Sequence, residues 1–169
     1  MNTIPIETER KFLIFMPNID TLLAQPQIKV KKITQTYIIN NENKNSRVRK
    51  IEENGSIKYI QTVKERISSL SCYEDEREIS EETYLERLKF ADNEKHPINK
   101  TRYAFPYKSH TLEVDVYSFW NDRATLEIEL AKEDELFEIP PFIEIIKEVS
   151  LDNRYKNTNL AKNVPFDEI

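Results

Sequence analysis

Charged residues recur along this chain in pairs separated by a single residue. Successive side chains of a β-strand point to opposite faces, so the members of such a pair share one face of their strand. Like charges held close in this way repel each other, and folding alone does not favour them. Seven segments carry the pattern or a close variant: Glu7-x-Glu9-x-Lys11, Arg47-x-Arg49, Thr62-x-Lys64, Glu74-x-Glu76, Lys100-x-Arg102, Glu113-x-Asp115 and Glu127-x-Glu129.

Two explanations account for charges at alternate strand positions. The outward face of an antiparallel sheet is solvated, and charges there also protect edge strands from aggregation. That explanation predicts mixed signs on each strand, with frequent serine and threonine. Here the signs are segregated, because four segments carry acidic pairs and three carry basic residues. The segregation indicates that each set faces a ligand rather than bulk water.

A charged interior is the alternative to a solvated outer face. The fourteen charged side chains of these segments would give such an interior eight negative and six positive charges. Buried ions need partners, so the interior would have to be hydrated and hold ligands. Carboxylate clusters suit Mg²⁺ or Mn²⁺, whereas arginine and lysine suit phosphate oxygens. The two kinds of group in one site indicate metal-assisted phosphoryl chemistry.

The elements that position these charges are mostly strands. Alternation of apolar and polar residues predicts eight strands with short connections, and therefore a mainly β (α+β) chain of antiparallel strands. Eight strands is a size at which a sheet can close into a barrel. The expected strands span residues 6–14, 28–40, two arms within 46–67, 70–79, 98–107, 111–120 and 124–130.

Turn and helix signals separate the expected strands. Asn54-Gly55 lies between two alternating runs and predicts a type I′ hairpin, and Gly55 is the only glycine of the chain. Asn18 and Ser80 are suited to cap short helices. The helix after Ser80 should bury Tyr84, Leu85 and Leu88, and Pro140-Pro141 should begin a helix that buries Phe142, Ile143, Ile146 and Val149. A further helical turn is expected around Asn159-Leu160-Ala161.

Length and composition restrict the class of protein. The 169 residues are expected to form one domain, 1–169. A net charge of −5 argues against nucleic acid as the main partner. The sequence has neither an apolar run of membrane-spanning length nor a signal peptide, which predicts a cytoplasmic protein without a membrane partner. A lone Cys72 and two histidines cannot supply a disulfide or an ordinary zinc site.

In its order of motifs, the chain resembles the CYTH-domain proteins of the triphosphate tunnel metalloenzyme superfamily. The defining Glu-x-Glu-x-Lys motif is matched by Glu7, Glu9 and Lys11. The remaining pairs follow in the family's order, and the segment from Glu148 to Tyr155 resembles the family's C-terminal part. The resemblance covers nearly the whole chain. Any one of these motifs is weak evidence, but seven in order are specific.

The resemblance implies a closed eight-stranded antiparallel barrel with a charged interior and a few flanking helices. It also implies hydrolysis of a triphosphate with Mg²⁺ or Mn²⁺. The implied substrate-binding residues are Lys11, Tyr37, Arg47, Arg49, Lys64, Lys100 and Arg102. The implied metal ligands are Glu7, Glu9, Glu76, Asp115, Glu127 and Glu129. The implied catalytic residues are Lys100 and Glu9, since Lys100, a metal ion or both would activate the attacking water.

The sequence is compatible with several alternative activities. Inorganic tripolyphosphate is the expected substrate, and class IV adenylate cyclase and thiamine triphosphatase are alternative activities on the same barrel. A non-catalytic module that binds polyphosphate or nucleotides is the alternative without turnover. Both a monomer and a homodimer are compatible with the sequence. The chain also departs from the family pattern at Cys72, where a basic residue is frequent, and a third acid, Glu78, follows Glu74 and Glu76.

Overall fold

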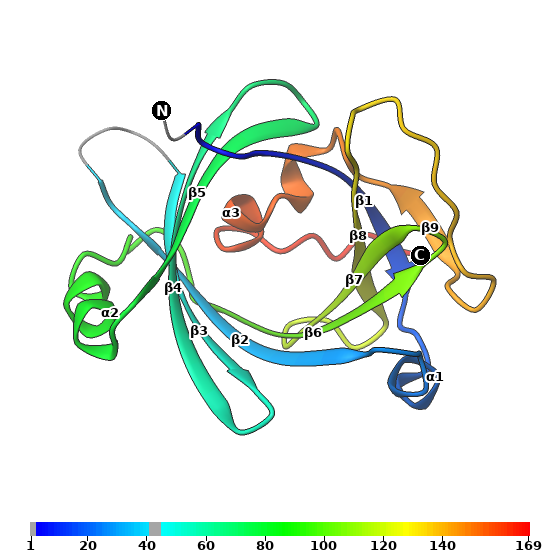
Figure 1. Cartoon of the computed structure of the whole chain (residues 1–169), viewed down its shortest axis with the longest axis horizontal. Coiled ribbons are helices and arrows are strands. Elements are labelled where there is room, and N and C mark those ends of the chain that lie inside the picture. Colours follow the sequence, from blue (N-terminus) through cyan, green and yellow to red (C-terminus); the bar gives the residue numbers. More distant parts are fainter. Residues whose placement is uncertain (1–2, 41–44) are drawn as a thin grey trace.

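The computed structural model describes residues 3–40 and 45–169. The chain forms one antiparallel sheet that curls into a barrel (Figure 1). The strands are β1 (Ile6–Phe15), β2 (Lys29–Ile38), β3 (Asn45–Glu53), β4 (Ser56–Arg66), β5 (Ser71–Ile79), β6 (Ile98–Tyr107), β7 (His110–Tyr117), β8 (Arg123–Glu129) and β9 (Ile145–Glu148).

The strand order is β5-β4-β3-β2-β6-β7-β8-β1-β9, and an additional pairing of β5 with β1 closes the barrel. Eight strands therefore form the closed barrel, and β9 lies outside it against β1. All pairings are antiparallel. The predicted fold class is confirmed, and the ninth strand is an addition that the sequence pattern did not indicate.

The closing seam between β1 and β5 is short. Within the described residues, three residue pairs form the ladder, with Ile6 opposite Tyr73, Glu7 opposite Cys72 and Thr8 opposite Ser71. The hydroxyl groups of Thr8 and Ser71 lie 2.7 Å apart and reinforce the seam. From Glu9 onward β1 pairs along its other edge with seven residues of β8. Glu7 therefore lies at the seam itself, next to a residue of β5.

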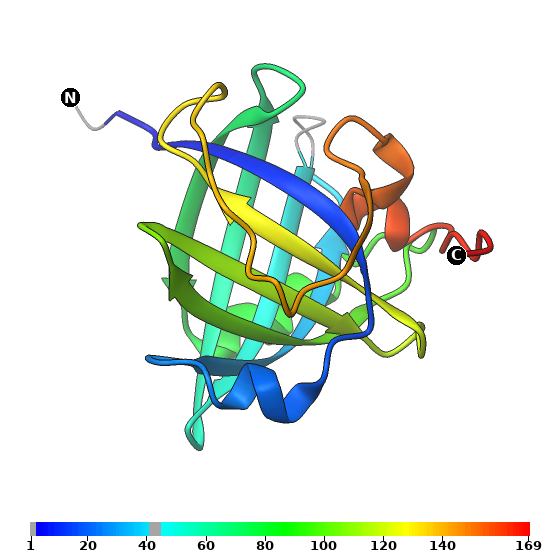
Figure 2. The same cartoon turned by 90° about the vertical axis from the view of Figure 1, so that its right-hand side faces the viewer.

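Apolar residues on the outer face of the barrel are covered by four segments. Helix α1 (Ile19–Leu23), the segment 131–144 and β9 pack over a cluster that includes Phe12, Leu112 and Leu126 (Figure 2). Helix α2 (Glu81–Leu88) covers the opposite side, where Tyr84 joins Ile38 and Val48. These layers leave the barrel interior to the polar residues. In the described part of the chain, no helix has the length and apolar character needed to cross a membrane.

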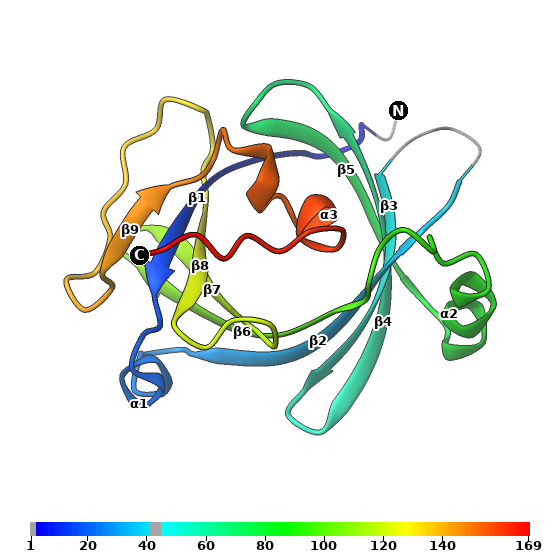
Figure 3. The same cartoon turned by 180° about the vertical axis from the view of Figure 1, so that it is seen from behind.

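The C-terminal segment fills one end of the barrel. The 3₁₀ helix η1 (Asn153–Tyr155) and helix α3 (Asn157–Leu160) place Tyr155 and Leu160 in a cluster with Leu13 and Tyr117. The last residues continue over this end (Figure 3), where the Trp120 indole donates a hydrogen bond of 3.0 Å to the Pro165 carbonyl. This end of the barrel is therefore closed by packed side chains.

The predicted caps and hairpin are confirmed. The side chain of Asn18 accepts a hydrogen bond from the Thr21 amide, and that of Ser80 accepts one from the Thr83 amide. Asn54 and Gly55 have φ angles of 51° and 77°, as a type I′ turn requires.

Two helix predictions are wrong. Leu85 of α2 is 54 % exposed rather than buried. After Pro140-Pro141 the chain makes a turn, in which the Ile143 amide bonds to the Pro140 carbonyl at 3.0 Å, and then continues as β9. The physical reason is the edge of β1: β5 leaves it after Thr8, and its backbone groups need a new partner.

Candidate active site

One wall of the barrel interior consists of charges that are already paired with each other. Asp115 of β7 accepts hydrogen bonds from Lys100 Nζ at 2.7 Å, from Arg102 Nε at 2.8 Å and from Arg102 Nη2 at 2.9 Å. Arg102 also contacts Glu113 and Glu127, and Lys11 Nζ lies 3.2 Å from Glu127 Oε1. We call this set the paired wall: Lys11, Lys100, Arg102, Glu113, Asp115 and Glu127.

The paired wall is deeply buried and shifts the protonation of its members. The Lys100 side chain is 1 % exposed and that of Asp115 is 0 % exposed. Burial lowers the pKa of Lys100 to about 8, although Asp115 opposes the shift. Burial tends to raise the pKa of Asp115, but Arg102 and Lys100 outweigh it and hold this pKa well below its usual range. Lys100 can therefore give up its proton near neutral pH.

A second wall lies at the closing seam and is looser. Lys64 Nζ of β4 donates a hydrogen bond of 2.7 Å to Glu7 Oε2 and lies 3.1 Å from Glu74 Oε2. Arg49 Nη2 donates to Glu76 Oε2 at 2.8 Å. The carboxylate side chains here are 17 % to 43 % exposed, in contrast to Asp115. We call this set the seam wall: Glu7, Arg49, Lys64, Glu74 and Glu76.

Two buried guanidinium groups at the seam wall have bonding capacity to spare. Arg47 and Arg49 are 8 % and 6 % exposed, and within the described residues the Nε atom of each has no hydrogen-bond partner. Arg47 Nη1 donates to Gln35 Oε1 at 3.3 Å, and Gln35 in turn donates to the Tyr37 hydroxyl at 3.0 Å. Burial, with Arg47 beside it, lowers the pKa of Arg49 to about 10. Buried donors of this kind call for an anion.

Two acidic groups of the barrel interior have pKa values above their usual range. Burial, followed by repulsion from Glu127, raises the pKa of Glu9 to about 8. Burial also raises the pKa of Glu113 to about 7. Glu129, opposite Glu9 in the β1–β8 register, is exposed at the mouth. The interior therefore holds more carboxylates than its own cations neutralise, which favours an added cation.

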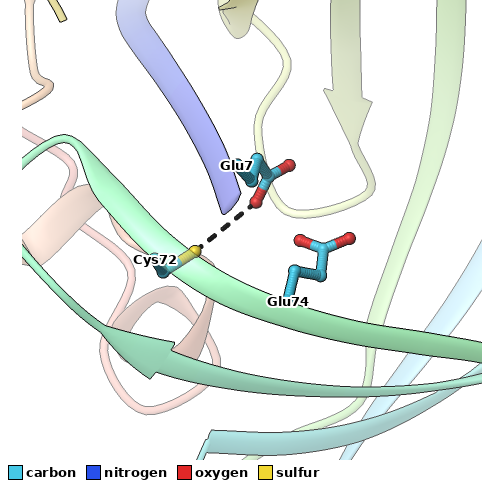
Figure 4. Close-up of side chains that lie close together, drawn as sticks. All are labelled: Glu7, Cys72 and Glu74. Carbon is cyan, nitrogen blue, oxygen red and sulfur yellow. Dashed lines mark hydrogen bonds between the residues drawn. The ribbon is translucent and has the colours of Figure 1, made fainter. Parts of the chain in front are cut away.

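One group of possible metal ligands lies across the seam. Ligand atoms of Glu7, Cys72 and Glu74 lie within 4.8 Å of one another, and Figure 4 shows all three converging. The Cys72 thiol is 3.7 Å from Glu7 Oε2. The two carboxylates fit Mg²⁺ or Mn²⁺, whereas the thiol is a softer donor than these cations prefer.

The structure distributes the predicted metal ligands over different surroundings. It places Glu74, rather than the predicted Glu76, beside Glu7, and Glu76 pairs with Arg49. Both oxygens of Asp115 are occupied by Lys100 and Arg102. The position of Glu74 could not be resolved from sequence, because Glu74, Glu76 and Glu78 share one face of β5.

Two cavities have residues of the seam wall in their linings. One has a volume of about 330 Å³ and is lined by acids that include Glu7, Glu74, Glu76 and Glu129. The other has a volume of about 100 Å³, and its lining includes Glu9, Lys11, Arg47 and Lys64. We call the second cavity the basic chamber. Its lining also includes Arg66 and the C-terminal residues Lys156, Asn157 and Thr158, which the sequence did not indicate because they belong to no charged pair.

The fold and the interior together define a class: an antiparallel tunnel with acids and bases arranged for a metal and a polyanion. The search against family models found no match. The chain is 37 % identical over 130 residues to an inorganic triphosphatase of Acetivibrio thermocellus, covering 76 % of this chain and 79 % of that protein. The chain belongs to the CYTH-domain family of triphosphate tunnel metalloenzymes.

Solved structures share the fold. The inorganic triphosphatase NE1496 is 24 % identical with a TM-score of 0.59, and the match covers 98 % of each chain. The PH1819 protein of Pyrococcus horikoshii OT3 is 20 % identical with a TM-score of 0.59, covering 76 % of this chain and 80 % of that one. HpAC1 from Hippeastrum is 14 % identical with a TM-score of 0.51, covering 75 % and 80 %. These likenesses support the barrel fold.

Proposed function

We propose that this protein hydrolyses inorganic tripolyphosphate inside its barrel, with Mg²⁺ or Mn²⁺ as the cofactor. The observation that carries the proposal is the pair of buried guanidinium groups, Arg47 and Arg49, which lie beside the carboxylates of the seam wall. Among residues 3–40 and 45–169, the Nε atom of each has no hydrogen-bond partner. A bound anion would accept hydrogen bonds from the two guanidinium groups, and a bound cation would neutralise the carboxylates. The relative from Acetivibrio thermocellus, named an inorganic triphosphatase, supports the same activity.

The basic residues hold the phosphate chain in this proposal. Arg47, Arg49 and Lys11 contact phosphate oxygens, the arginines through their planar forks and the lysine as a point charge. Lys64, Arg102 and the Tyr37 hydroxyl complete the predicted substrate contacts. The basic chamber, with a volume of about 100 Å³, fits a phosphate chain better than a nucleoside.

Glu7 and Glu74 are the residues best placed to hold the metal, with further carboxylates from Glu9 on the same strand as Glu7 and from Glu129 on the adjoining β8. When bound, the metal supplies positive charge that offsets the charge of the phosphate oxygens. The remaining predicted ligands, Glu76, Asp115 and Glu127, each hold a basic residue of the interior in place.

Lys100 is the proposed general base. With a pKa of about 8, a minor fraction of its amine is neutral at pH 7 and can accept a proton. The oxygen of a water molecule attacks the terminal phosphorus while the bond to the bridging oxygen breaks. The water proton passes to Lys100 Nζ, and orthophosphate and pyrophosphate are the products. Asp115, 2.7 Å from Nζ, fixes the position of the amine.

The proposal extends to the domain organisation, the partners and the location of the protein. Residues 1–169 act as a single domain, and the substrate is a small triphosphate rather than nucleic acid, in keeping with the net charge of −5. The protein works in the cytoplasm as a monomer or homodimer.

An activity panel tests the proposed function. Purified protein is incubated with tripolyphosphate, ATP or thiamine triphosphate and either Mg²⁺ or Mn²⁺, and the products are identified. We expect orthophosphate and pyrophosphate from tripolyphosphate at the highest rate. Cyclic AMP from ATP would establish the adenylate cyclase alternative instead. Thermal protection by tripolyphosphate without any turnover would establish a binding module.

A further inference from the structure

The seam wall already contains a cation at the place where a metal is expected, and this cation is the ammonium group of Lys64. Lys64 lies opposite Glu74 in the β4–β5 register, and Glu7 lies opposite Cys72 across the seam. Three adjoining strands thus bring the three side chains together. Lys64 Nζ is 2.7 Å from Glu7 Oε2 and 3.1 Å from Glu74 Oε2.

The ammonium group and a divalent cation compete for the same atoms. The carboxylates of Glu7 and Glu74 also form the ligand group across the seam (Figure 4). Mg²⁺ binds oxygen at about 2.0–2.1 Å, so an ion on these carboxylates leaves no room or charge balance for an ammonium group beside it. One cation has to leave before the other binds.

We propose that Lys64 is an exchangeable counter-ion, which occupies the Glu7–Glu74 pair in the metal-free protein and moves to the phosphate chain when metal and triphosphate bind. The inference deepens the proposed function and rests on it for the identity of the cation and the anion. It assigns Lys64 a positioning role that links the occupancy of the metal site to the occupancy of the basic chamber.

The basic chamber is where the displaced ammonium group goes. Lys64 lines it together with Lys11, Arg47 and Arg66. Release of Lys64 from its carboxylates adds a positive charge that faces these cations, which is unfavourable unless an anion is present. A metal ion alone therefore binds weakly, and a triphosphate strengthens metal binding because it takes up Lys64. By thermodynamic reciprocity the metal strengthens triphosphate binding by the same factor.

Lys100 shows why the exchange is specific to Lys64. Asp115, the partner of Lys100, is fully buried and also accepts two hydrogen bonds from Arg102. A cation from solvent therefore cannot reach Asp115. Glu7 and Glu74, in contrast, are 21 % and 17 % exposed and line the acidic cavity of about 330 Å³. Of these two lysines, Lys64 is the one whose carboxylate partners a competing ion can reach.

Titration of metal-free protein with MnCl₂, followed by calorimetry and without any triphosphate, tests the exchange. Lys64→Met removes the competing charge and should tighten Mn²⁺ binding about tenfold, within the usual range of coupling between sites. Lys64→Arg keeps the charge and should bind Mn²⁺ as the wild type does. Lys58→Met, which removes an exposed lysine of the same strand, is the matched control and should also match the wild type.

A second titration includes imidotriphosphate, a tripolyphosphate analogue that resists hydrolysis. The analogue should tighten Mn²⁺ binding in the wild type by a larger factor than in Lys64→Met, because only the wild type has an ammonium group to transfer. Equal Mn²⁺ affinity of folded Lys64→Met and wild type, without the analogue, would overturn the inference.

A crystal structure of the wild type with Mn²⁺ tests the exchange without any variant. We expect Lys64 Nζ to have left hydrogen-bonding distance of Glu7 and Glu74. Mn²⁺ bound at Glu7 and Glu74 with both lysine pairs intact would refute the exchange. These measurements do not depend on turnover, so a protein that exchanges cations but hydrolyses no triphosphate would refute the proposed function and leave the exchange standing.

Discussion

The two charged walls of the barrel interior use similar residues and differ in how completely they are paired. In the paired wall, Asp115 is 0 % exposed and has contacts from both Lys100 and Arg102. In the seam wall, Glu76 is 43 % exposed, and among the described residues it forms an ion pair with Arg49 alone. Three acids and three bases balance the paired wall. Beside the seam wall, the buried Nε atoms of Arg47 and Arg49 have no hydrogen-bond partner in the part of the chain that the structure describes.

This difference in pairing indicates which charges are free to bind a ligand. A saturated buried ion pair gains little from a new partner, because it must first give up contacts that compensate its desolvation. A half-exposed carboxylate or an unsatisfied guanidinium group gains the full interaction. We therefore interpret the paired wall as a scaffold that orients Lys100, and the seam wall as the place where cation and anion exchange. Substitutions in each wall test this division.

Arg49→Ala should lower turnover of tripolyphosphate by about 10³-fold, the size seen when a buried electrostatic contact to the reacting group is removed. The variant should remain folded, because its partner Glu76 is solvated. Arg77→Ala, which removes a 67 % exposed guanidinium group on β5, is the control and should retain wild-type rates. Steady-state kinetics and a thermal melt on each protein provide the comparison.

Glu9→Gln should lower turnover by about 10²–10³-fold, because a carboxylate near the metal site is lost while the volume is kept. Burial raises the pKa of Glu9 to about 8, so the ionised carboxylate destabilises the metal-free protein. The variant cannot ionise at this position, and it should therefore melt at or above the wild-type temperature. Wild-type turnover in this variant would show that the assignment of the lumen face of β1 is wrong.

Asp115→Asn should reduce the free energy of unfolding by about 3–5 kcal/mol, since it leaves Lys100 and Arg102 buried with one partner fewer. Glu76→Gln, the matched change in the seam wall, should cost about 0–1 kcal/mol. Urea denaturation of both variants measures the contrast. Equal losses of stability would contradict the division of the interior into a scaffold and an exchangeable wall.

The stability of the metal-free protein should pass through a minimum near pH 8. Glu9 and Glu113 have pKa values raised to about 8 and about 7, so the folded state binds more protons than the unfolded chain and loses stability as pH rises from about 4.5 through these values. Lys100 has a pKa lowered to about 8, so stability is regained as pH rises further toward its usual value of 10.5.

Thermal melts between pH 5 and 10 should show a minimum in the melting temperature. Each kcal/mol lost from the free energy of unfolding should lower the melting temperature by about 2–4 °C. Glu9→Gln should make the fall between pH 5 and 8 shallower. Mg²⁺ should do the same in the wild type, because it replaces the protons. A melting temperature that rises steadily from pH 5 to 8 in metal-free protein would contradict the pKa shifts.

Sequence reasoning predicted the eight barrel strands and the interior charges because both depend on the same period of two residues. It missed β9, since the need for that strand arises from where β5 leaves β1 in space, and proline pairs favour helix starts locally. It could not separate Glu74 from Glu76, whose partners come from other strands. The closure of the barrel by Tyr155 and Leu160 is likewise a long-range contact that no local pattern encodes.

A crystal structure with Mn²⁺ and imidotriphosphate tests the division of the interior into a scaffold and a ligand-binding wall. We predict the anion between Arg47 and Arg49, the metal on Glu7 and Glu74, and Asp115 still bonded to Lys100 and Arg102. An anion bound outside the barrel, or Asp115 released from its partners to ligate the metal, would contradict the account.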